Sequence, residues 1–112
     1  MNALRNRVQL IGNLGMDPEI LNLDSGKKLA KFSLATNDSY TNKKGEKVKN
    51  TQWHNVVAWG KTADLVENYL KKGKEIALEG KLVYHQYETE KGEKRRSTEV
   101  RMNELLMIGS KS

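Results

Sequence analysis

The sequence contains no cysteine, only two histidines and one proline, and no long apolar run. Without cysteine, disulfides, thiolate metal sites and cysteine nucleophiles are excluded. The histidines, His54 and His85, are too few and too poorly placed for a zinc site. No apolar run reaches the roughly 18 residues of a membrane-spanning helix, and residues 1–7 lack the apolar region of a signal peptide. We therefore expect a cytoplasmic protein with no cofactor, no metal and no membrane partner.

Positive charge is what the chain has in excess. Lysine and arginine number 20 against 14 aspartate and glutamate, which gives a net charge of +6 and a pI near 9.6. Such a balance suits a polyanion, either nucleic acid or, less often, an anionic membrane surface. Charge alone does not choose between them. The length of 112 residues predicts a single domain over residues 1–112.

Alternation of apolar and polar residues predicts strands over 4–14, 19–23, 28–36, 51–60, 74–87 and 96–108. The polar segment 37–50 is expected to be a long exposed loop or a flexible hairpin tip, and 88–94 a turn. The alternation slips at Glu104 and Leu105, which indicates a β-bulge.

A single helix is predicted over 61–72, where Ala63, Val66 and Leu70 share one face. Thr62 is the expected N-cap and Gly73 the expected C′ glycine, with Lys71 and Lys72 in the last turn. The long strands then follow the order three strands, one helix, two strands. This order predicts an all-β OB-fold, a five-stranded, partly open Greek-key barrel with one helix between strands 3 and 4, although other small α+β folds share the count.

The segment 51–60 carries both tryptophans of the chain, Trp53 and Trp59, on one face of a strand. The other face, with His54, Val56 and Ala58, is mostly small and apolar. On this strand alone, buried and outward-facing tryptophans are equally consistent with the pattern. Other strands already supply a core, which favours outward tryptophans; these core residues are Val8, Leu10, Phe32, Leu34, Ile76, Leu78 and Val100.

Two basic segments each carry a tyrosine. Tyr40 precedes Lys43, Lys44, Lys47 and Lys49, and Tyr87 precedes Lys91, Lys94, Arg95 and Arg96. Lysine-rich loops are often ordinary solvated surface. Aromatic rings interleaved with cations are also what sequence-tolerant binding of single strands requires, because each stacked base contributes roughly 1–3 kcal/mol and cations hold the phosphates.

Four segments carry a resemblance to a known family: GNLGMDPE (12–19), FSLATNDSY (32–40), TQWHNVVAWGKTADLVENYLKKG (51–73) and LEGKL (78–82). They closely resemble the bacterial single-stranded DNA-binding proteins, over nearly the whole chain, and WHNVVAWGKTA is the most specific part. The resemblance implies an OB-fold homotetramer that binds and protects single-stranded DNA in replication, recombination and repair, in the bacterial cytoplasm and nucleoid, without enzymatic activity.

The resemblance also implies roles for individual residues. Trp53 matches a family tryptophan, Trp59 falls where phenylalanine is common, and Tyr40 and Tyr87 fall where well-studied members have tryptophan. These four are the predicted base-stacking residues, and His54 matches a histidine linked to subunit assembly. The predicted phosphate-binding residues combine basic family positions with the basic segments: Arg7, Lys43, Lys44, Lys49, Lys61, Lys72, Lys94, Arg95 and Arg96.

Typical family members continue into a tail with an acidic, hydrophobic tip that recruits replication and repair proteins. This chain ends in the basic sequence GSKS, so tail-mediated partners are not expected of these 112 residues. Two alternative functions stay open. One is an OB-fold with an RNA-binding or primosome role, and the other is an OB-fold nuclease, which the absence of an acid–base or metal-ligand pattern disfavours.

Overall fold

A computed structural model describes residues 5–108 of the chain. Its elements are β1 (Val8–Leu14), β2 (Glu19–Asn22), β3 (Lys28–Thr41), β4 (Lys47–Trp59), α1 (Lys61–Tyr69), β5 (Glu75–Glu88) and β6 (Lys94–Met107). All the expected strands and the single expected helix are therefore present. Leu4, the predicted first strand residue, lies outside the described residues.

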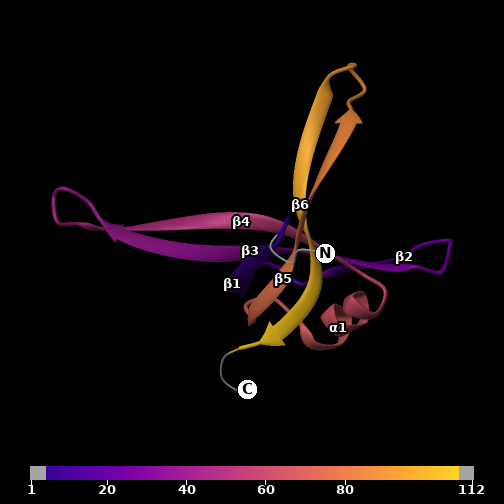
Figure 1. The fold of residues 1–112 in the computed structure, drawn as a ribbon, viewed down its shortest axis with the longest axis horizontal. Coiled ribbons are helices and arrows are strands. Elements are labelled where there is room, and N and C mark those ends of the chain that lie inside the picture. Colours follow the sequence, from indigo (N-terminus) through magenta and orange to yellow (C-terminus); the bar gives the residue numbers. More distant parts are fainter. Residues whose placement is uncertain (1–4, 109–112) are drawn as a thin grey trace.

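Five strands form a barrel. The sheet runs β1-β5-β6-β4-β3, and β1 pairs again with β3, which completes the ring (Figure 1). Two short pairings complete it: Asn13 and Leu14 of β1 against β3, and a parallel contact of Val56 and Val57 with β6. The short β2 pairs only with the outer edge of β3. This is the predicted OB-fold, with α1 between the third and fourth strands of the barrel.

The barrel interior is filled by the apolar face of each strand and by one face of α1. Phe32, Leu34, Ile76, Leu78 and Val100 are at most 3% exposed, as predicted, and Val8 and Leu10 pack against them from the rim. From the helix come Ala63, Val66 and Leu70, the three residues of the predicted apolar face. The remaining buried cluster members are Leu14, Ala30, Val56, Ala58 and Met102.

Two glycines let neighbouring strands approach at the points where the barrel closes or bends. A Cβ on Gly12 would collide with the carbonyl oxygen of Ala35, where β1 meets β3. A Cβ on Gly80 would collide with the carbonyl oxygen of Arg101, beside the register shift between β5 and β6. That shift leaves Asn103 as the extra residue on β6, so the bulge predicted from Glu104 and Leu105 is confirmed within one residue.

Two long hairpins extend from the barrel in different directions (Figure 1). We call β3–β4 beyond the barrel, residues 36–52, the first arm and β5–β6, residues 83–99, the second arm. Of the two forms expected for 37–50, the long loop is wrong and the hairpin is present, but as a regular ladder over most of its length: β3 continues to Thr41 and β4 begins at Lys47, paired residue by residue. Only the five-residue tip, 42–46, is outside the ladder. An arm in solvent has polar side chains on both faces, so its sequence lacks the alternation of apolar and polar residues that predicts a strand.

The tips of the two arms and of the β2–β3 hairpin share one construction. At each tip the first residue exchanges backbone hydrogen bonds with the fourth and fifth residues, at 2.8 to 3.0 Å. The fourth residue is a glycine with φ between 80 and 85°, a conformation that side chains disfavour. These glycines are Gly26, Gly45 and Gly92.

The ends of α1 differ from the prediction. Gly60, with φ of 61°, is the N-cap in place of Thr62, because the helix begins immediately after β4 and only the turn at Gly60 separates them. The helix ends at Tyr69, so Lys71 and Lys72 lie beyond its last turn. Gly73 belongs to the turn before β5, and its N–H donates to the carbonyl of Leu14 at 2.9 Å. No helix in residues 5–108 is long and apolar enough to cross a membrane.

Candidate nucleic-acid interface

The outer face of β4 presents both tryptophans, as predicted. Trp53 is 63% exposed and Trp59 is half-buried, whereas Val56 and Ala58, on the inner face, are at most 1% exposed. The two rings are six residues apart on one strand, about 20 Å along its length. The strand therefore carries two aromatic surfaces on the outside of the barrel, with room for several nucleotides between them.

The ring of Trp53 lies over Gly15, in the segment that follows β1. A Cβ on Gly15 would collide with ring carbon Cζ3 of Trp53. The N–H of Gly15 donates to the carbonyl of Ser33 at 3.0 Å, which fixes this segment beside β3. Gly15 thus provides a flat seat for one face of the indole and leaves the opposite face exposed. Nothing local in the sequence indicates this contact.

Trp59 has a cation against its ring. The guanidinium carbon of Arg101, on β6, lies 5.8 Å from the ring centroid, within the range of a cation–π interaction. The register places Arg101 beside Val57, one step along the outer face from Trp59. Lys27, from the β2–β3 tip, lines a surface hollow together with Trp59 and Arg101. The sequence prediction included neither of these two cations, because the pairing of β4 with β6 that places Arg101 and the contact of Gly60 with Lys28 beside Lys27 are not local in sequence.

Between the two tryptophans lies a shallow groove of about 340 Å³ across β3, β4 and β6, lined by both polar and apolar side chains. Lys31, Ser33 and Asn55 line it, together with two carboxylates, Glu19 and Glu99. Glu19 is opposite Lys31 in the ladder, and Glu99 shares a hydrogen bond with Nε2 of His85. The groove therefore contains acidic as well as basic side chains, and Ser33 and Asn55 offer hydroxyl and amide groups for hydrogen bonding.

The predicted tyrosines lie on the arms, away from the tryptophans. Tyr40 is 57% exposed near the end of the first arm, and Tyr87 is 53% exposed near the end of the second. By strand alternation Tyr40 lies on the opposite face of the first arm from Trp53. Tyr87 is directly opposite Arg95 in the ladder. The structure thus brings Tyr87 together with a cation and separates Tyr40 from the tryptophan face.

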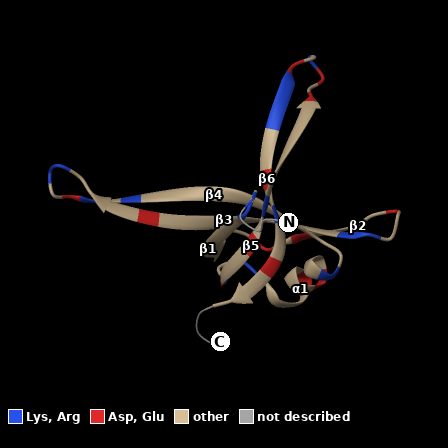
Figure 2. Cartoon of the chain, in the orientation of Figure 1, with Lys and Arg blue, Asp and Glu red and all other residues tan. Residues whose placement is uncertain are grey.

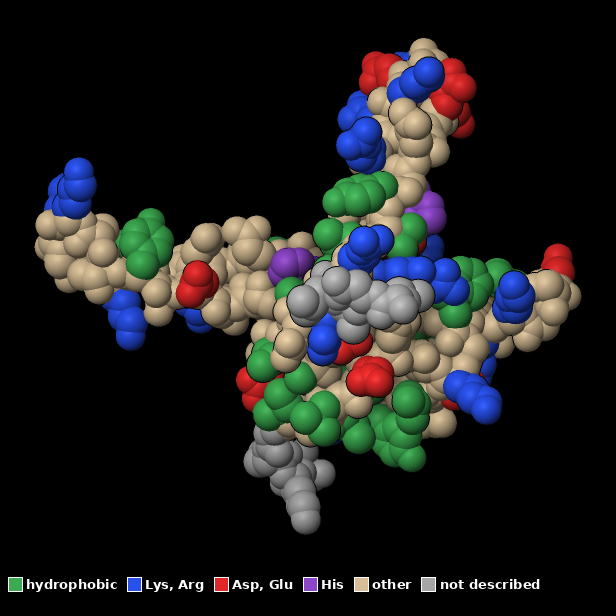
Figure 3. Space-filling view, in the orientation of Figure 1, with side chains coloured by type: hydrophobic (Ala, Val, Ile, Leu, Met, Phe, Trp, Pro, Cys, Tyr) green, Lys and Arg blue, Asp and Glu red, His purple; other side chains and the backbone are tan. Residues whose placement is uncertain are grey.

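The predicted phosphate-binding residues are spread over several surfaces. Figure 2 shows basic residues at the tip of the first arm and along β6 in the second arm, and the space-filling view of Figure 3 shows more basic side chains over the barrel between the arms. Lys43 and Lys44 lie in the first tip, and Lys49 alternates onto the face of Trp53. Lys94, Arg95 and Arg96 begin β6, with Arg95 on the opposite face from the other two.

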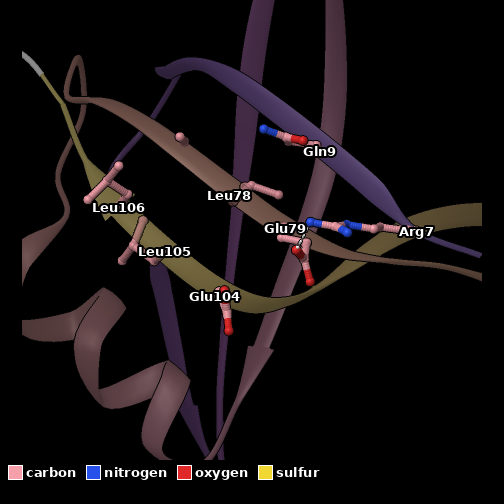
Figure 4. A pocket seen from close by; sticks show the side chains of 8 residues that line it. Arg7, Gln9, Leu78, Glu79, Glu104, Leu105 and Leu106 are labelled. Atoms are coloured by element: carbon pink, nitrogen blue, oxygen red, sulfur yellow. Dashed lines mark ion pairs between the residues drawn. The ribbon is translucent and has the colours of Figure 1, made fainter. Parts of the chain in front are cut away.

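The remaining predicted cations lie on the barrel. Lys61 follows Trp59 and Gly60 directly, at the start of α1. Lys72 lies beyond the other end of the helix, where its backbone N–H donates to Asp17 at 2.8 Å. Arg7 forms an ion pair of 2.6 Å with Glu79 across β1 and β5 (Figure 4). Arg7 thus has a carboxylate partner already, whereas Lys43 and Lys44 in the first tip form no ion pair within residues 5–108.

His54, the predicted subunit-interface residue, is half-buried just outside the barrel. Its Nε2 shares a hydrogen bond of 2.9 Å with Oγ1 of Thr36 across β3 and β4. The ring lies near the pairing of β1 with β3, since its ladder partner Leu34 also pairs with Leu14. A hydrogen-bonded histidine at a strand edge suits a structural role better than a catalytic one.

Fold and surface together define an OB-fold with an aromatic and basic outer face. The chain belongs to the single-strand binding protein family, which it matches over residues 5–108. Single-stranded DNA-binding protein 1 of Chlorobaculum tepidum is 40% identical over 107 residues, 95% of this chain and 66% of that protein. The single-stranded DNA-binding protein of Neisseria meningitidis is 36% identical, over 96% of this chain and 62% of its own length. The chain thus spans about two thirds of these relatives.

Two solved structures resemble the whole fold. A Plasmodium falciparum SSB in complex with ssDNA superimposes with a TM-score of 0.84 at 31% identity, covering 97% of this chain and 100% of that one. A deletion mutant of the single-stranded DNA binding protein from Thermus aquaticus gives 0.80 at 31% identity, over 93% of this chain and 50% of that one.

Proposed function

We propose that this chain binds single-stranded DNA without sequence preference, by stacking bases on aromatic rings and holding phosphates with lysine and arginine. In this role it protects unpaired strands during replication, recombination and repair, and its place is the bacterial cytoplasm and nucleoid. The proposed stacking residues are Trp53, Trp59, Tyr40 and Tyr87. The proposed phosphate contacts are Arg7, Lys43, Lys44, Lys49, Lys61, Lys72, Lys94, Arg95 and Arg96.

The observation that carries the proposal is the outward placement of Trp53 and Trp59 on one face of β4. A base offers a flat π-surface whatever its identity, so stacking tolerates any sequence. Trp53 is 63% exposed although it is a large aromatic residue. The core of the barrel is complete without its ring, so packing of the fold does not require a tryptophan at this position. Membership of the single-strand binding protein family and the likeness to a structure with ssDNA support the same function.

A fluorescence titration tests this function. We expect oligo-dT to quench tryptophan emission, and the binding constant to fall steeply with salt because phosphate contacts release counterions. Trp53→Ala should lose roughly 1–3 kcal/mol of binding free energy, and Trp53→Phe less, since phenylalanine keeps a ring. A matched oligo-rU measures the preference for DNA. Unchanged emission at low salt with excess oligo-dT would contradict the proposal.

We further propose that the chain assembles as a homotetramer through two surfaces. The first is an apolar patch on the outer face of β1, β5 and β6. Ile11, Ala77 and Leu106 are adjacent in the ladder, and Ile11 and Leu106 are 55% and 67% exposed. Beside them is a hollow of about 370 Å³ with the Arg7–Glu79 ion pair and Gln9 at its far end (Figure 4).

The second proposed surface is the open edge of β1. In the described chain this strand pairs with β3 only at Asn13 and Leu14, so residues 8–12 have one edge without a strand partner. Such an edge can pair with the same edge of a second copy about a two-fold axis. His54 lies near the start of this edge, which suits its predicted interface role. Two different self-complementary surfaces on one chain generate a closed tetramer.

A further inference from the structure

A hollow of about 510 Å³ lies where the end of β4, the β2–β3 tip and β6 meet. Its lining residues are Lys27, Trp59, Gly60 and Arg101. They come from three separate parts of the chain and combine an indole, two cations and the turn into α1. We call this place the Trp59 hollow. Its composition is that of a nucleotide site, because a base needs a flat ring and a phosphate needs positive charge.

The two cations of the Trp59 hollow are available for a ligand. Among the described residues, neither Lys27 nor Arg101 forms an ion pair, whereas their neighbour Lys28 holds Asp64 and Glu67 at 2.8 and 2.6 Å. Lys27 is exposed on the β2–β3 tip. The hollow therefore keeps its positive charge for an external anion, while the carboxylates of α1 are already bound to Lys28.

Arg101 has a second effect, on the indole itself. Its guanidinium lies against the Trp59 ring at 5.8 Å, and a planar cation in this position restricts the ring and still presents N–H donors at its edge. Lysine cannot reproduce this contact, because its ammonium is a point charge that neither stacks as a plane nor donates in a fork. Arg101 is therefore suited to hold the ring and a phosphate at the same time.

We propose that the Trp59 hollow binds one nucleotide of the single strand, with its base on Trp59 and its phosphate between Lys27 and Arg101. Arg101 acts there as a positioning residue for the indole as well as a phosphate ligand. This proposal rests on the proposed function and adds two residues to it. The hollow is then one end of the path along β4, about 20 Å from the Trp53 ring.

The test uses a variant in which Trp59 is the only tryptophan. The chain has two tryptophans, so Trp53→Phe leaves the emission of Trp59 alone. In this background we compare Lys27→Gln, Arg101→Gln and Arg101→Lys with Lys71→Gln, which removes the same charge from an exposed lysine outside the hollow. Each variant is titrated with oligo-dT over a range of salt concentrations, and a thermal melt confirms that it is folded.

We expect Lys27→Gln and Arg101→Gln each to flatten the plot of log binding constant against log salt by about 0.7, the value of one phosphate contact on a single strand. Arg101→Lys should keep the slope and still reduce the quenching of Trp59, because its charge remains and the planar contact is lost. If Lys27→Gln and Arg101→Gln both show the same salt slope and the same quenching as Lys71→Gln, the proposed nucleotide site in the Trp59 hollow is wrong. Failure of the unmodified chain to bind oligo-dT would instead overturn the proposed function.

Discussion

At the scale of single residues, two glycines constrain this protein in different ways. Gly12 faces the backbone of Ala35 where the barrel closes, and Gly15 faces the ring of Trp53. Backbone at a closed barrel cannot move away from a new methyl group, whereas an exposed indole can rotate. The first glycine therefore serves the fold, and the second serves the orientation of an aromatic ring on the proposed binding face.

Gly15→Ala should weaken binding of oligo-dT with little change in the melting temperature. The new Cβ displaces the indole from its place over Gly15, so the binding free energy should fall by no more than the roughly 1–3 kcal/mol of one stacked base. Gly12→Ala provides the contrast, since it should lower the melting temperature clearly because β1 and β3 must separate. Thermal melts and fluorescence titrations of both variants measure the two effects. Binding by Gly15→Ala equal to that of the unmodified chain would show that the seat has no role.

At the scale of elements, the helix is tied to the barrel by one lysine. Lys28, the first residue of β3, reaches Asp64 and Glu67 on α1 at 2.8 and 2.6 Å. Its hydrogen bond to Asp64, followed by that to Glu67, raises the pKa of Lys28 above its ordinary value. A raised pKa in the folded state means that the charged form stabilises folding. This contribution is fully present below the lysine pKa of the unfolded chain and is lost as pH rises through the folded value.

The melting temperature should therefore depend on Lys28 in a pH-dependent way. The difference between the unmodified chain and Lys28→Met should stay constant through neutral pH and shrink above about pH 10.4, where unfolded lysine loses its proton. The effect is small, because exposed ion pairs contribute little and salt screens them. Lys71→Met is the control for loss of an exposed lysine. A Lys28→Met difference that stays constant to about pH 12 would contradict this account.

The elements also show what a sequence pattern can reveal. Strands that border the core, such as β4 near Val56 and Ala58, alternate because one face is buried, and this alternation predicts the strands. The outward tryptophans follow only when the core residues of the other strands are considered as well. The arms lack the alternation, so the sequence predicts a loop or a flexible hairpin tip over 37–50, which is mostly ladder. The Arg101 contact was missed for another reason: it depends on the pairing of two strands whose paired residues are over 40 positions apart.

The same reason explains the missed seat of Trp53. A glycine in a loop predicts a bend, and nothing local indicates that an indole from β4 will lie on Gly15. The likeness of the motifs to a family supplies the proposed stacking residues, yet it does not supply the residues that support them in this chain. The proposed ligand-facing residues are thus easier to predict than the residues that hold them in place.

At the scale of the whole molecule, the arms and the barrel have different roles in the proposed function. The molecule extends 54 by 44 by 33 Å, which is wide for its length because both arms extend into solvent. Hairpins without a core of their own are marginally stable in water, so contacts with the proposed DNA ligand or with the proposed partner subunits would stabilise the arms. The barrel is the rigid part, and it carries the Trp53–Trp59 face as well as the apolar patch on β1, β5 and β6.

The apolar patch gives the last prediction. Leu106 is the most exposed large hydrophobic residue of the described chain, at 67%, and it adjoins Ala77 and Ile11 in the ladder. If this patch joins two dimers, a charge at its centre must be desolvated on assembly, which costs several times what an apolar contact contributes. Leu106→Glu should therefore form dimers, whereas the unmodified chain, as the proposed tetramer, should have about four times the 12.8 kDa mass of one chain.

Light scattering of the two proteins decides the matter, with Leu65→Glu as the matched control. Leu65 is 44% exposed on α1, outside both proposed surfaces, so its variant should keep the mass of the unmodified chain. A dimer in Leu106→Glu would leave the β1 edge as the remaining contact, and a further change near that edge, His54→Ala, should then yield monomers. A tetramer that survives Leu106→Glu would contradict the patch, because a buried carboxylate without a partner is incompatible with a stable apolar interface.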